Sequence, residues 1–583
     1  MFLKKAIKII IIFAKERFFL WRKGKKMSDK VRLFTLGGLD EDGKNCTVVE
    51  VNDEIYVVGC GVKYPDRTMP GIDYVIPDFT YLRENKHRVK AYLLPHGHDD
   101  EMGALAYLYE DVPAPIYGSN VTIEMFKNFT RHVGTANVKY HFNVVKPSSV
   151  FYIGARKISF FQTSHNIAQS SGIAINTSLG NVVLTSDYVI ENNAAPAYLT
   201  DLNMIAKIAE DKTLVLCPES VFAGKSGYTA PHYKIIPLIE KEVKNAQGRI
   251  FIGMFGLNFY NIHGIINLMV SSHKRIIPYD EETADILQSM RQAGQLILPN
   301  ENYAPADDIN RYRGVDIVVL MLGYGTRLYR KIALLAAGQS DGNRPVSLEE
   351  SDTFIMACPA NDNTEIEATD ALDELYRSGC HVVPISKKSF LNMHASEEDL
   401  KMMISLLHPK YYVPLKGYFK DLLNNAEVSL KSGGALTHQS VFLLENGTAV
   451  TFTEKGAFVE PNAVVHGDIM IDGIGVGDVG SAVLEERQKL SQGVAIMAVT
   501  VDKKTRKILA GPDIQFRGLV LPNESESLMR DVTKVFNECL FEDLGREDMD
   551  IEAIKNDLYE HCFRLIRRQT GKEPMVLPLI VEK

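Results

Sequence analysis

Residues 96–101 read His-Gly-His-Asp-Asp-Glu, a spacing of side chains that suits metal binding. Alternate residues just after a strand face the same side, so His96, His98 and Asp100 can direct two imidazole nitrogens and a carboxylate toward one point. A histidine at the sixth position would complete the ligands of a second metal ion, but this residue is Glu101. The segment therefore predicts a metal centre with one altered ligand position.

Two further residues of metal-ligand type stand at the ends of apolar runs. His165 follows the expected strand 158–163, and Asp187 follows the expected strand 182–185. Layered α/β proteins collect their functional side chains at such strand ends. A single histidine such as His165 is more often an ordinary core or surface residue. Three strand ends with metal-ligand types together favour one shared site.

The length and composition of the chain limit which class of protein it can be. The chain has 583 residues, 45% apolar and 24% charged, which exceeds what one core normally supports and predicts two or three globular domains. Its seven cysteines are scattered without a Cys-x-x-Cys spacing, so neither a disulfide framework nor a thiolate zinc site is indicated. We expect a reducing, cytoplasmic location.

The first 26 residues differ from the rest. They hold nine Lys and Arg residues against one acid, and their apolar run, Ile9–Ala14, is too short for a membrane span, so no stable membrane insertion is expected. We interpret 1–26 as a basic extension upstream of the native start at Met27; an interfacial basic helix is the alternative. Without it, 56 basic residues stand against 72 acidic ones, a net charge of −16. A polyanion would then have to bind through a local basic groove or a metal site.

The elements that must position these residues alternate between strands and helices. Several strand candidates are continuous apolar runs, which is typical of strands covered on both faces in a layered α/β fold. The candidates are 55–58, 89–94, 158–163, 182–185, 213–216, 250–254, 315–322, 354–357, 381–385 and 411–414. A helix is predicted over 397–407, because Ser396 and Asp399 have the spacing of a capping box.

A different pattern begins near Ala463. The glycines between 473 and 480 lack the sequence context of a phosphate-binding loop and indicate a turn-rich segment. After it we expect strands 494–501, 507–514 and 575–581 and helices 525–544 and 551–568. These form a small α+β domain without a catalytic constellation, which we interpret as an assembly module.

Several short strings make the chain resemble the ribonuclease J family, in particular its degenerate second paralogue in Gram-positive bacteria. The strings are Leu36-Gly37-Gly38, Gly71-Ile72-Asp73, Thr185-Ser186-Asp187-Tyr188, His394-Ala395-Ser396-Glu397-Glu398 and Pro409-Lys410-Tyr411-Tyr412. The resemblance runs from about Val31 to the C-terminus. It implies a metallo-β-lactamase αββα sandwich with an inserted β-CASP α/β domain and a small α+β C-terminal domain.

The resemblance also implies a division of the chain. The parts are the basic extension 1–26, the metallo-β-lactamase domain in two pieces, 27–213 and 387–440, the β-CASP domain 214–386, a linker 441–470 and the C-terminal assembly domain 471–583. Family members cleave RNA with two metal ions that share a nucleophilic water.

When the family's site residues are matched one by one to this sequence, only part of the pattern is present. His96, His98 and His165 correspond to the first metal's imidazoles, Asp187 to the bridging carboxylate and Asp100 to a ligand of the second metal. The degenerate positions are Glu101 and Lys416 in place of the second metal's histidines, Gly59 in place of a supporting aspartate, and Tyr260 in place of a histidine of the insertion.

The residues that would handle RNA phosphate are altered too. The family's Ser-Gly-His string reads Asn392-Met393-His394, so His394 and Asn392 are the expected RNA contacts. If the chain is active, Asp187 and His394 are the expected catalytic residues. In the insertion, Tyr260-Asn261 replaces a histidine and a cation, and the loop Gly323–Leu328 has also changed.

These changes predict one bound ion, Zn²⁺ or else Mn²⁺ or Mg²⁺, and an empty second site. We expect the ammonium of Lys416 to pair with Asp100 and Glu101 where the second ion would lie. The alternatives are that Lys416 points to solvent and that Glu101 still binds a hard cation.

Three functions are compatible with the sequence. The first is a ribonuclease J-like protein of RNA processing and decay, with weak or no catalysis of its own, that acts as partner subunit of an active ribonuclease J through homo- or hetero-oligomers of its C-terminal domain. The second is an active metal-dependent 5′→3′ exoribonuclease and endoribonuclease that uses the first-metal ligands. The third is a small-molecule hydrolase, against which the insertion over the site argues.

Overall fold

The computed structural model describes residues 28–66, 68–191, 194–229, 235–339, 346–360, 364–387, 393–473, 475–477, 479–519, 522–546 and 550–583. The expected extension 1–26 lies outside these residues. The chain divides into two compact units. One contains the residues up to Lys63 together with Ile76–Asp468, and the other contains Tyr64–Val75 and Ile469–Lys583. The fold is mixed α/β with several sheets.

The first unit contains an eight-stranded sheet of order β20-β19-β1-β2-β3-β5-β6-β7. Its strands are β1 (Val31–Gly37), β2 (Cys46–Val51), β3 (Glu54–Val58), β5 (Val89–Leu93), β6 (Ile116–Gly118), β7 (Phe142–Val144), β19 (Ala449–Thr453) and β20 (Gly456–Glu460). The α-helices that lie between its strands along the chain, from β3 to β7, are α2 (Thr80–Glu84), α3 (Asp99–Met102), α4 (Leu105–Leu108) and α5 (Asn120–His132). The metal-site loop thus follows β5.

A six-stranded sheet of order β18-β12-β11-β10-β9-β8 positions the rest of the site. Its strands are β8 (Ser149–Ile153), β9 (Arg156–Gln162), β10 (Ser171–Thr177), β11 (Gly180–Ser186), β12 (Thr213–Pro218) and β18 (Tyr411–Tyr412). The strands β9, β11, β12 and β18 run in one direction, because β10 is antiparallel to both β9 and β11, while the pairs β11–β12 and β12–β18 are parallel. Their carboxyl ends therefore lie along one edge.

The two sheets enclose a shared core. Alternate residues of the six-stranded sheet, such as Ile173 and Val182, pack against Leu33 and Val49 of the eight-stranded sheet. The residues between them, such as Ala174, face the opposite side and pack against α6 (Leu202–Glu210) and α12 (Glu397–Leu407). A further helix, α13 (Phe419–Lys431), follows β18. This alternation gives the six-stranded sheet its continuous apolar sequences.

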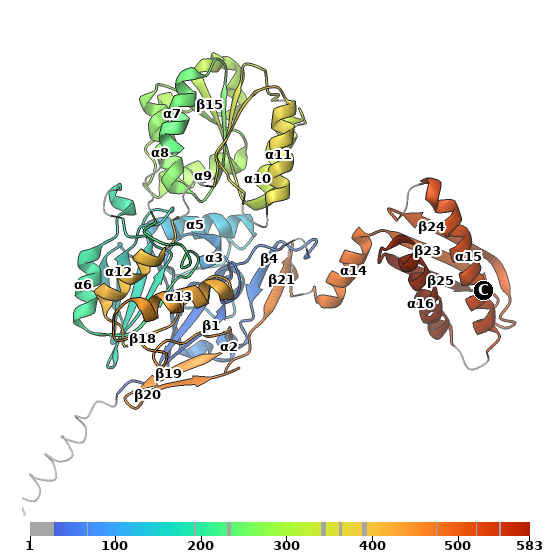
Figure 1. The fold of residues 1–583 in the computed structure, drawn as a ribbon, viewed down its shortest axis with the longest axis horizontal. Coiled ribbons are helices and arrows are strands. Elements are labelled where there is room, and N and C mark those ends of the chain that lie inside the picture. Colours follow the sequence, from blue (N-terminus) through green and yellow to red (C-terminus); the bar gives the residue numbers. More distant parts are fainter. Residues whose placement is uncertain are drawn as a thin grey trace, which may run out of the picture. The chain divides into compact units, whose positions relative to one another are not determined.

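A parallel five-stranded sheet forms a separate layer system within the first unit. Its order is β14-β15-β13-β16-β17. The strands are β13 (Ile250–Phe255), β14 (Arg275–Pro278), β15 (Ile317–Gly323), β16 (Thr353–Met356) and β17 (His381–Pro384), and the helices are α7 (Ile235–Asn245), α8 (Phe259–Ser271), α9 (Glu281–Gln292), α10 (Gly325–Ala336) and α11 (Glu365–Arg377). Figure 1 shows α7 and α8 on one side of this sheet and α10 and α11 on the other.

The second unit ends in an α+β domain. The strands β23 (Val494–Val501), β24 (Ile508–Arg517) and β25 (Met575–Glu582) form a sheet of order β24-β23-β25. The helices α15 (Pro522–Leu544) and α16 (Ile551–Thr570) cover it and share its core. Before them lie β21 (Asp468–Asp472), β22 (Gly475–Val476) and α14 (Ser481–Ser491), while β4 (Tyr74–Pro77) comes from the earlier part of the chain.

The predicted elements agree with the observed ones. Each of the ten strand candidates outside the C-terminal domain coincides with an observed strand, and the helix 397–407 has the predicted bounds and capping box. The segment 441–470 differs from the expected linker, because β19 and β20 extend the eight-stranded sheet beside β1. Short, turn-separated strands at a sheet edge lack the long apolar run that marks a buried strand.

Among the described residues, no helix combines the length and apolar character needed to cross a membrane.

Candidate metal centre

The loop that carries the first histidines is fixed to the end of β3 by backbone hydrogen bonds. His96 and His98 follow β5, and His98 is the residue before α3. The amide of Cys60 donates to the carbonyl of Glu101 (2.7 Å), and a Cβ at Gly61 would lie 1.6 Å from the carbonyl oxygen of Asp100. Only glycine permits this approach, so Gly61 determines how closely the acidic turn of α3 packs.

His165 and Asp187 reach the same point from the six-stranded sheet. His165 lies three residues beyond the end of β9, and Asp187 directly follows β11. Both are buried, with 1% and 2% of their surface exposed. The parallel direction of β9 and β11 places both residues at one edge, beside the loop after β5.

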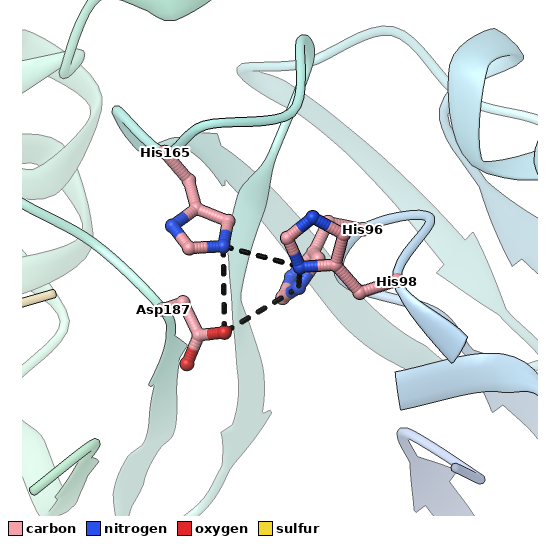
Figure 2. Close-up of side chains that lie close together, drawn as sticks. All are labelled: His96, His98, His165 and Asp187. Atoms are coloured by element: carbon pink, nitrogen blue, oxygen red, sulfur yellow. Dashed lines mark hydrogen bonds and ion pairs between the residues drawn. The ribbon is translucent and has the colours of Figure 1, made fainter. Parts of the chain in front are cut away.

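The four side chains converge on one small volume (Figure 2). His96 Nε2 lies 3.1 Å from His98 Nδ1, which lies 3.3 Å from His165 Nε2. Asp187 Oδ2 lies 3.5 Å from both His96 Nε2 and His165 Nε2. Zinc–nitrogen and zinc–oxygen bonds of about 2.0–2.1 Å in a tetrahedral site imply ligand separations of roughly 3.3–3.5 Å. The four donor atoms therefore have the spacing of one tetrahedral metal site.

The opposite nitrogen of each imidazole is held by an oxygen. His165 Nδ1 donates to the carbonyl of Met393 (2.8 Å), and His98 Nε2 lies 3.4 Å from the carbonyl of Leu257. His96 Nδ1 lies 3.2 Å from Ser186 Oγ. Because a carbonyl only accepts, the neutral His98 and His165 direct their lone pairs inward, where they face each other. Such outer partners orient metal-binding imidazoles.

The protonation states suit a cation. Burial lowers the pKa of His96, His98 and His165 below the usual range, and the neighbouring imidazoles lower those of His96 and His165 further. Neutral imidazoles whose lone pairs face one another repel unless a positive charge lies between them. The donor set of three imidazoles and one carboxylate is one that zinc uses, so this cluster can hold a metal ion.

The other oxygen of Asp187 faces a protein cation. Lys416 Nζ lies 2.5 Å from Asp187 Oδ1, 2.8 Å from Glu101 Oε1 and 3.5 Å from Asp100 Oδ2. Lys416 is 9% exposed, so it does not point to solvent. The expected ion pair with Asp100 and Glu101 is confirmed, and its shortest contact is with Asp187. Asp100 also accepts a hydrogen bond from Asn45 Nδ2 (2.8 Å).

The protonation states of Lys416, Glu101 and Asp187 depend on one another. Burial would lower the pKa of Lys416, but Asp187 and Glu101 raise it well above its usual value. Burial raises the pKa of Glu101 to about 8, against the opposing effect of Lys416. Burial would also raise the pKa of Asp187, but Lys416 and His394 hold it well below the usual range. Lys416 is therefore a permanent ammonium beside an ionised Asp187.

Glu219 is a site residue that the sequence did not single out. It follows β12, is 1% exposed, and its Oε2 lies 2.6 Å from His394 Nδ1. Its Oε1 accepts from the amides of Tyr188 and Ala395. Burial would lower the pKa of His394, but Glu219 and Asp187 raise it to about 9. The position of Glu219 at a strand end, like Asp187, is the signal that points to it.

Comparison with other proteins shows a family relationship. The chain is 31% identical over 559 residues to ribonuclease J 2 of Staphylococcus epidermidis and, equally, to ribonuclease J 2 of Staphylococcus aureus. The alignments cover 96% of this chain and 99% of those proteins. The chain belongs to the ribonuclease J family. The family model described as the ribonuclease J C-terminal domain matches residues 482–583, which confirms the predicted membership.

One solved structure shares the fold. It is a protein of unknown function from Enterococcus faecalis V583, with a TM-score of 0.50 and 14% identity, covering 73% of this chain and 100% of that chain. At this identity the likeness concerns the fold alone.

Gly59 lies against the side chain of Glu101 in this member of the ribonuclease J family. Its φ is +69°, and a Cβ there would lie 2.7 Å from Glu101 Oε2. A side chain at position 59 would therefore require the present carboxylate of Glu101 to shift. The two residues are neighbours in space, although they lie 42 positions apart in the sequence.

Of the positions that the sequence analysis singled out between 257 and 328, Tyr260 contacts the residue next to His165. The amide of Tyr260 donates to the carbonyl of Asn166 (2.8 Å), and the Tyr260 ring packs edge-on against Tyr198. Asn261 is buried in the first turn of α8, where the side chain of Asn258 accepts from its amide. Gly323 ends β15 and Leu328 lies in α10. Asn392, an expected RNA contact, lies outside the described residues.

Proposed function

We propose that this chain is an RNA-binding member of the ribonuclease J family with weak or no turnover of its own, and that it acts as partner subunit of an active ribonuclease J. The contact that carries the proposal is the ammonium of Lys416, 2.5 Å from the oxygen of Asp187 that would bridge to a second ion. A unit charge repels another roughly 4 Å away by about 4 kcal/mol at an effective dielectric constant of 20. A divalent ion beside Lys416 is therefore strongly disfavoured.

The proposed architecture is a metallo-β-lactamase αββα sandwich with a β-CASP insertion. The two packed sheets with helices on the far side of the six-stranded sheet support the sandwich. The parallel sheet of β13–β17 supports the insertion at 214–386. With it we retain 27–213 and 387–440 as the two pieces of the first domain and 471–583 as the C-terminal assembly domain, and move the strands β19 and β20 from the linker into the sandwich.

We assign one metal ion, Zn²⁺ before Mn²⁺ or Mg²⁺, to His96, His98, His165 and Asp187. The three imidazoles favour zinc over the oxygen-preferring cations. A zinc ion held there would polarise a bound water or phosphate oxygen. Asp187 orients its Oδ2 toward this ion, while its Oδ1 is neutralised by Lys416 rather than shared with a second ion.

RNA binding is supported by a cation next to the centre. His394 pairs with Glu219, has a pKa of about 9 and keeps 19% of its side chain exposed. A protonated imidazole of this kind can contact a phosphate oxygen. The related proteins bear the name ribonuclease, and we extend RNA as ligand to this chain.

The partner role is supported by the C-terminal domain. Leu579 and Val581 lie two residues apart on β25, a strand at the edge of its sheet, and are 48% and 56% exposed. Apolar side chains on an open strand edge favour association with another chain. The double change Leu579→Lys with Val581→Lys should abolish co-purification with an active ribonuclease J without altering the metal content.

The test of the catalytic proposal compares two proteins. Incubate the purified chain and its Asp187→Ala variant with 5′-monophosphorylated RNA and Mn²⁺, and follow product formation. We expect the same background with both proteins. Turnover that is present in the original chain and lost in Asp187→Ala would establish an enzyme and reject the scaffold function.

An active metal-dependent exoribonuclease and endoribonuclease is the second candidate. It is favoured by one observation: all four ligands of the first site are present at metal-binding separations. In that case, removal of the ion by a chelator abolishes RNA cleavage, and Zn²⁺ or Mn²⁺ restores it. If chelation changes RNA binding and stability alone, the ion is structural.

A further inference from the structure

A second cluster of metal-binding side chains lies in the C-terminal domain, within the second unit. Cys539 lies on α15, and Asp557 and His561 lie on α16. One donor atom from each lies within 4.8 Å of the others. Asp557 and His561 are four residues apart and so share a face of α16. Two helices thus present sulfur, oxygen and nitrogen to one point.

The individual separations resemble those of a bound ion. Cys539 Sγ lies 3.3 Å from Asp557 Oδ2 and 3.7 Å from His561 Nδ1, and His561 Nδ1 lies 3.6 Å from Asp557 Oδ1. Tetrahedral zinc with bonds of about 2.3 Å to sulfur and 2.0–2.1 Å to nitrogen and oxygen gives edges of roughly 3.3–3.6 Å. The two Asp557 distances belong to different oxygens, so an adjustment of this carboxylate would close the three donors around a metal ion.

A fourth acidic residue adds negative charge. Asp543, one turn after Cys539 on α15, is 1% exposed, and its Oδ2 lies 3.5 Å from Cys539 Sγ. Arg546 lies 3.5 Å from its other oxygen. Burial and the nearby Asp557 raise the pKa of Asp543, which reflects two carboxylates in one place. A divalent cation would relieve this repulsion.

The cluster is also accessible. The side chains of Asp557 and His561 are 38% and 47% exposed, while Cys539 is 8% exposed. An ion can therefore enter from solvent and meet a buried sulfur. Without an ion, His561 Nδ1 hydrogen-bonds to the carbonyl of Asp557 (3.0 Å), and binding would replace this bond.

We propose that Cys539, Asp557 and His561 form a second, structural metal site that binds Zn²⁺, with Asp543 as the adjoining fourth donor, and that the ion clips α15 to α16. Sequence spacing alone did not indicate a thiolate zinc site, because the ligands come from two helices rather than from a Cys-x-x-Cys turn. The site is independent of the cluster at His96 and contains the one cysteine ligand of the two clusters.

The test uses Co²⁺ as the probe, because a thiolate bound to Co²⁺ gives a sulfur-to-metal charge-transfer absorption that imidazole and carboxylate ligands do not. Titrate the full, reduced chain with Co²⁺. We expect this absorption to appear and to saturate at one thiolate-bound Co²⁺ per chain, whereas Co²⁺ held by the cluster at His96 adds no sulfur band. Cys539→Ala should abolish it, while Cys562→Ala, which removes a buried cysteine of α16 outside the cluster, should leave it unchanged.

The second variant keeps the proposal testable if Cys539→Ala does not fold. His561→Gln changes a half-exposed side chain. The sulfur-to-cobalt band should still form in this variant, but the affinity of this site for Co²⁺ should fall by about tenfold or more. Zn²⁺ should slow amide hydrogen exchange in α15 and α16 of the original chain and of Cys562→Ala, and not of Cys539→Ala. The proposal is overturned if the sulfur-to-cobalt band is absent at excess Co²⁺. It is also overturned if the band forms with the same Co²⁺ affinity in His561→Gln as in the original chain.

Discussion

The two sides of Asp187 differ in the kind of positive charge that they are built to receive. Around Oδ2, three buried imidazoles converge, and those of His98 and His165 direct lone pairs inward toward the place of a metal ion. Around Oδ1, the ammonium of Lys416 already supplies the charge, and Glu101 and Asp100 lie beside it. A lysine brings its cation on a covalent tether, so it gives fixed charge without the open coordination positions that hydrolysis needs. One side can exchange its cation and the other cannot.

The largest effect is expected from removing the tethered cation. Lys416→Met leaves Asp187 and Glu101 buried without their partner, which should lower the free energy of unfolding by about 3–5 kcal/mol. The measurement is denaturant unfolding with a chelator present, so that no added ion replaces the ammonium. Lys420→Met, the same change at an exposed lysine four residues on, should shift stability by less than about 0.5 kcal/mol. Equal effects of the two changes would contradict the buried ion pair.

The next test converts the surroundings of Asp187 Oδ1 into a metal-binding site like the one around Oδ2. Glu101→His with Lys416→His replaces the ion pair by two imidazoles and should add one bound metal ion per chain to those of the original chain. Metal content is measured by mass spectrometry after gel filtration. Glu101→His alone keeps the ammonium and should add no ion. If the double variant gains no metal, the ligand assignment around Asp187 Oδ1 is wrong.

A smaller effect is expected from the outer partner of His96. Ser186→Ala removes the oxygen that lies 3.2 Å from His96 Nδ1 and should weaken metal binding by roughly 10- to 100-fold. Competition with a chelating dye measures the affinity. Ser164→Ala is the matched control, because its buried hydroxyl makes no hydrogen bond with the residues that the structure describes. An equal loss in both variants would mean that Ser186 does not orient the imidazole.

The smallest effect concerns the contact between Gly59 and Glu101. Gly59→Ala meets both an unfavourable φ and the carboxylate at 2.7 Å, whereas Gly134→Ala at φ +77° meets nothing within 4 Å. The left-handed backbone should cost each variant roughly 1 kcal/mol. The excess loss in Gly59→Ala, measured by denaturant unfolding, is the contribution of the contact. No excess would show that Glu101 simply moves aside.

Local features of the fold follow from the sequence because they depend on neighbouring residues. The apolar runs at 213–216 and 250–254 and the capping box at Ser396 each encode one element, and all are observed. The strands β19 and β20 were not predicted, since their place in the sheet depends on the pairing of β19 with β1 and of β20 with β19 rather than on their own residues alone.

For the site, the sequence by itself determined which residue types are present: His96, His98, His165 and Asp187 at strand ends, and Glu101 and Lys416 as the expected ion pair. The tertiary structure alone decided that Lys416, 229 residues from Asp187, touches its free oxygen, that Glu219 holds His394, and that Cys539 meets His561. Periodicity and spacing describe contacts within one element. Contacts between elements are set by sheet order and packing, which no short segment encodes.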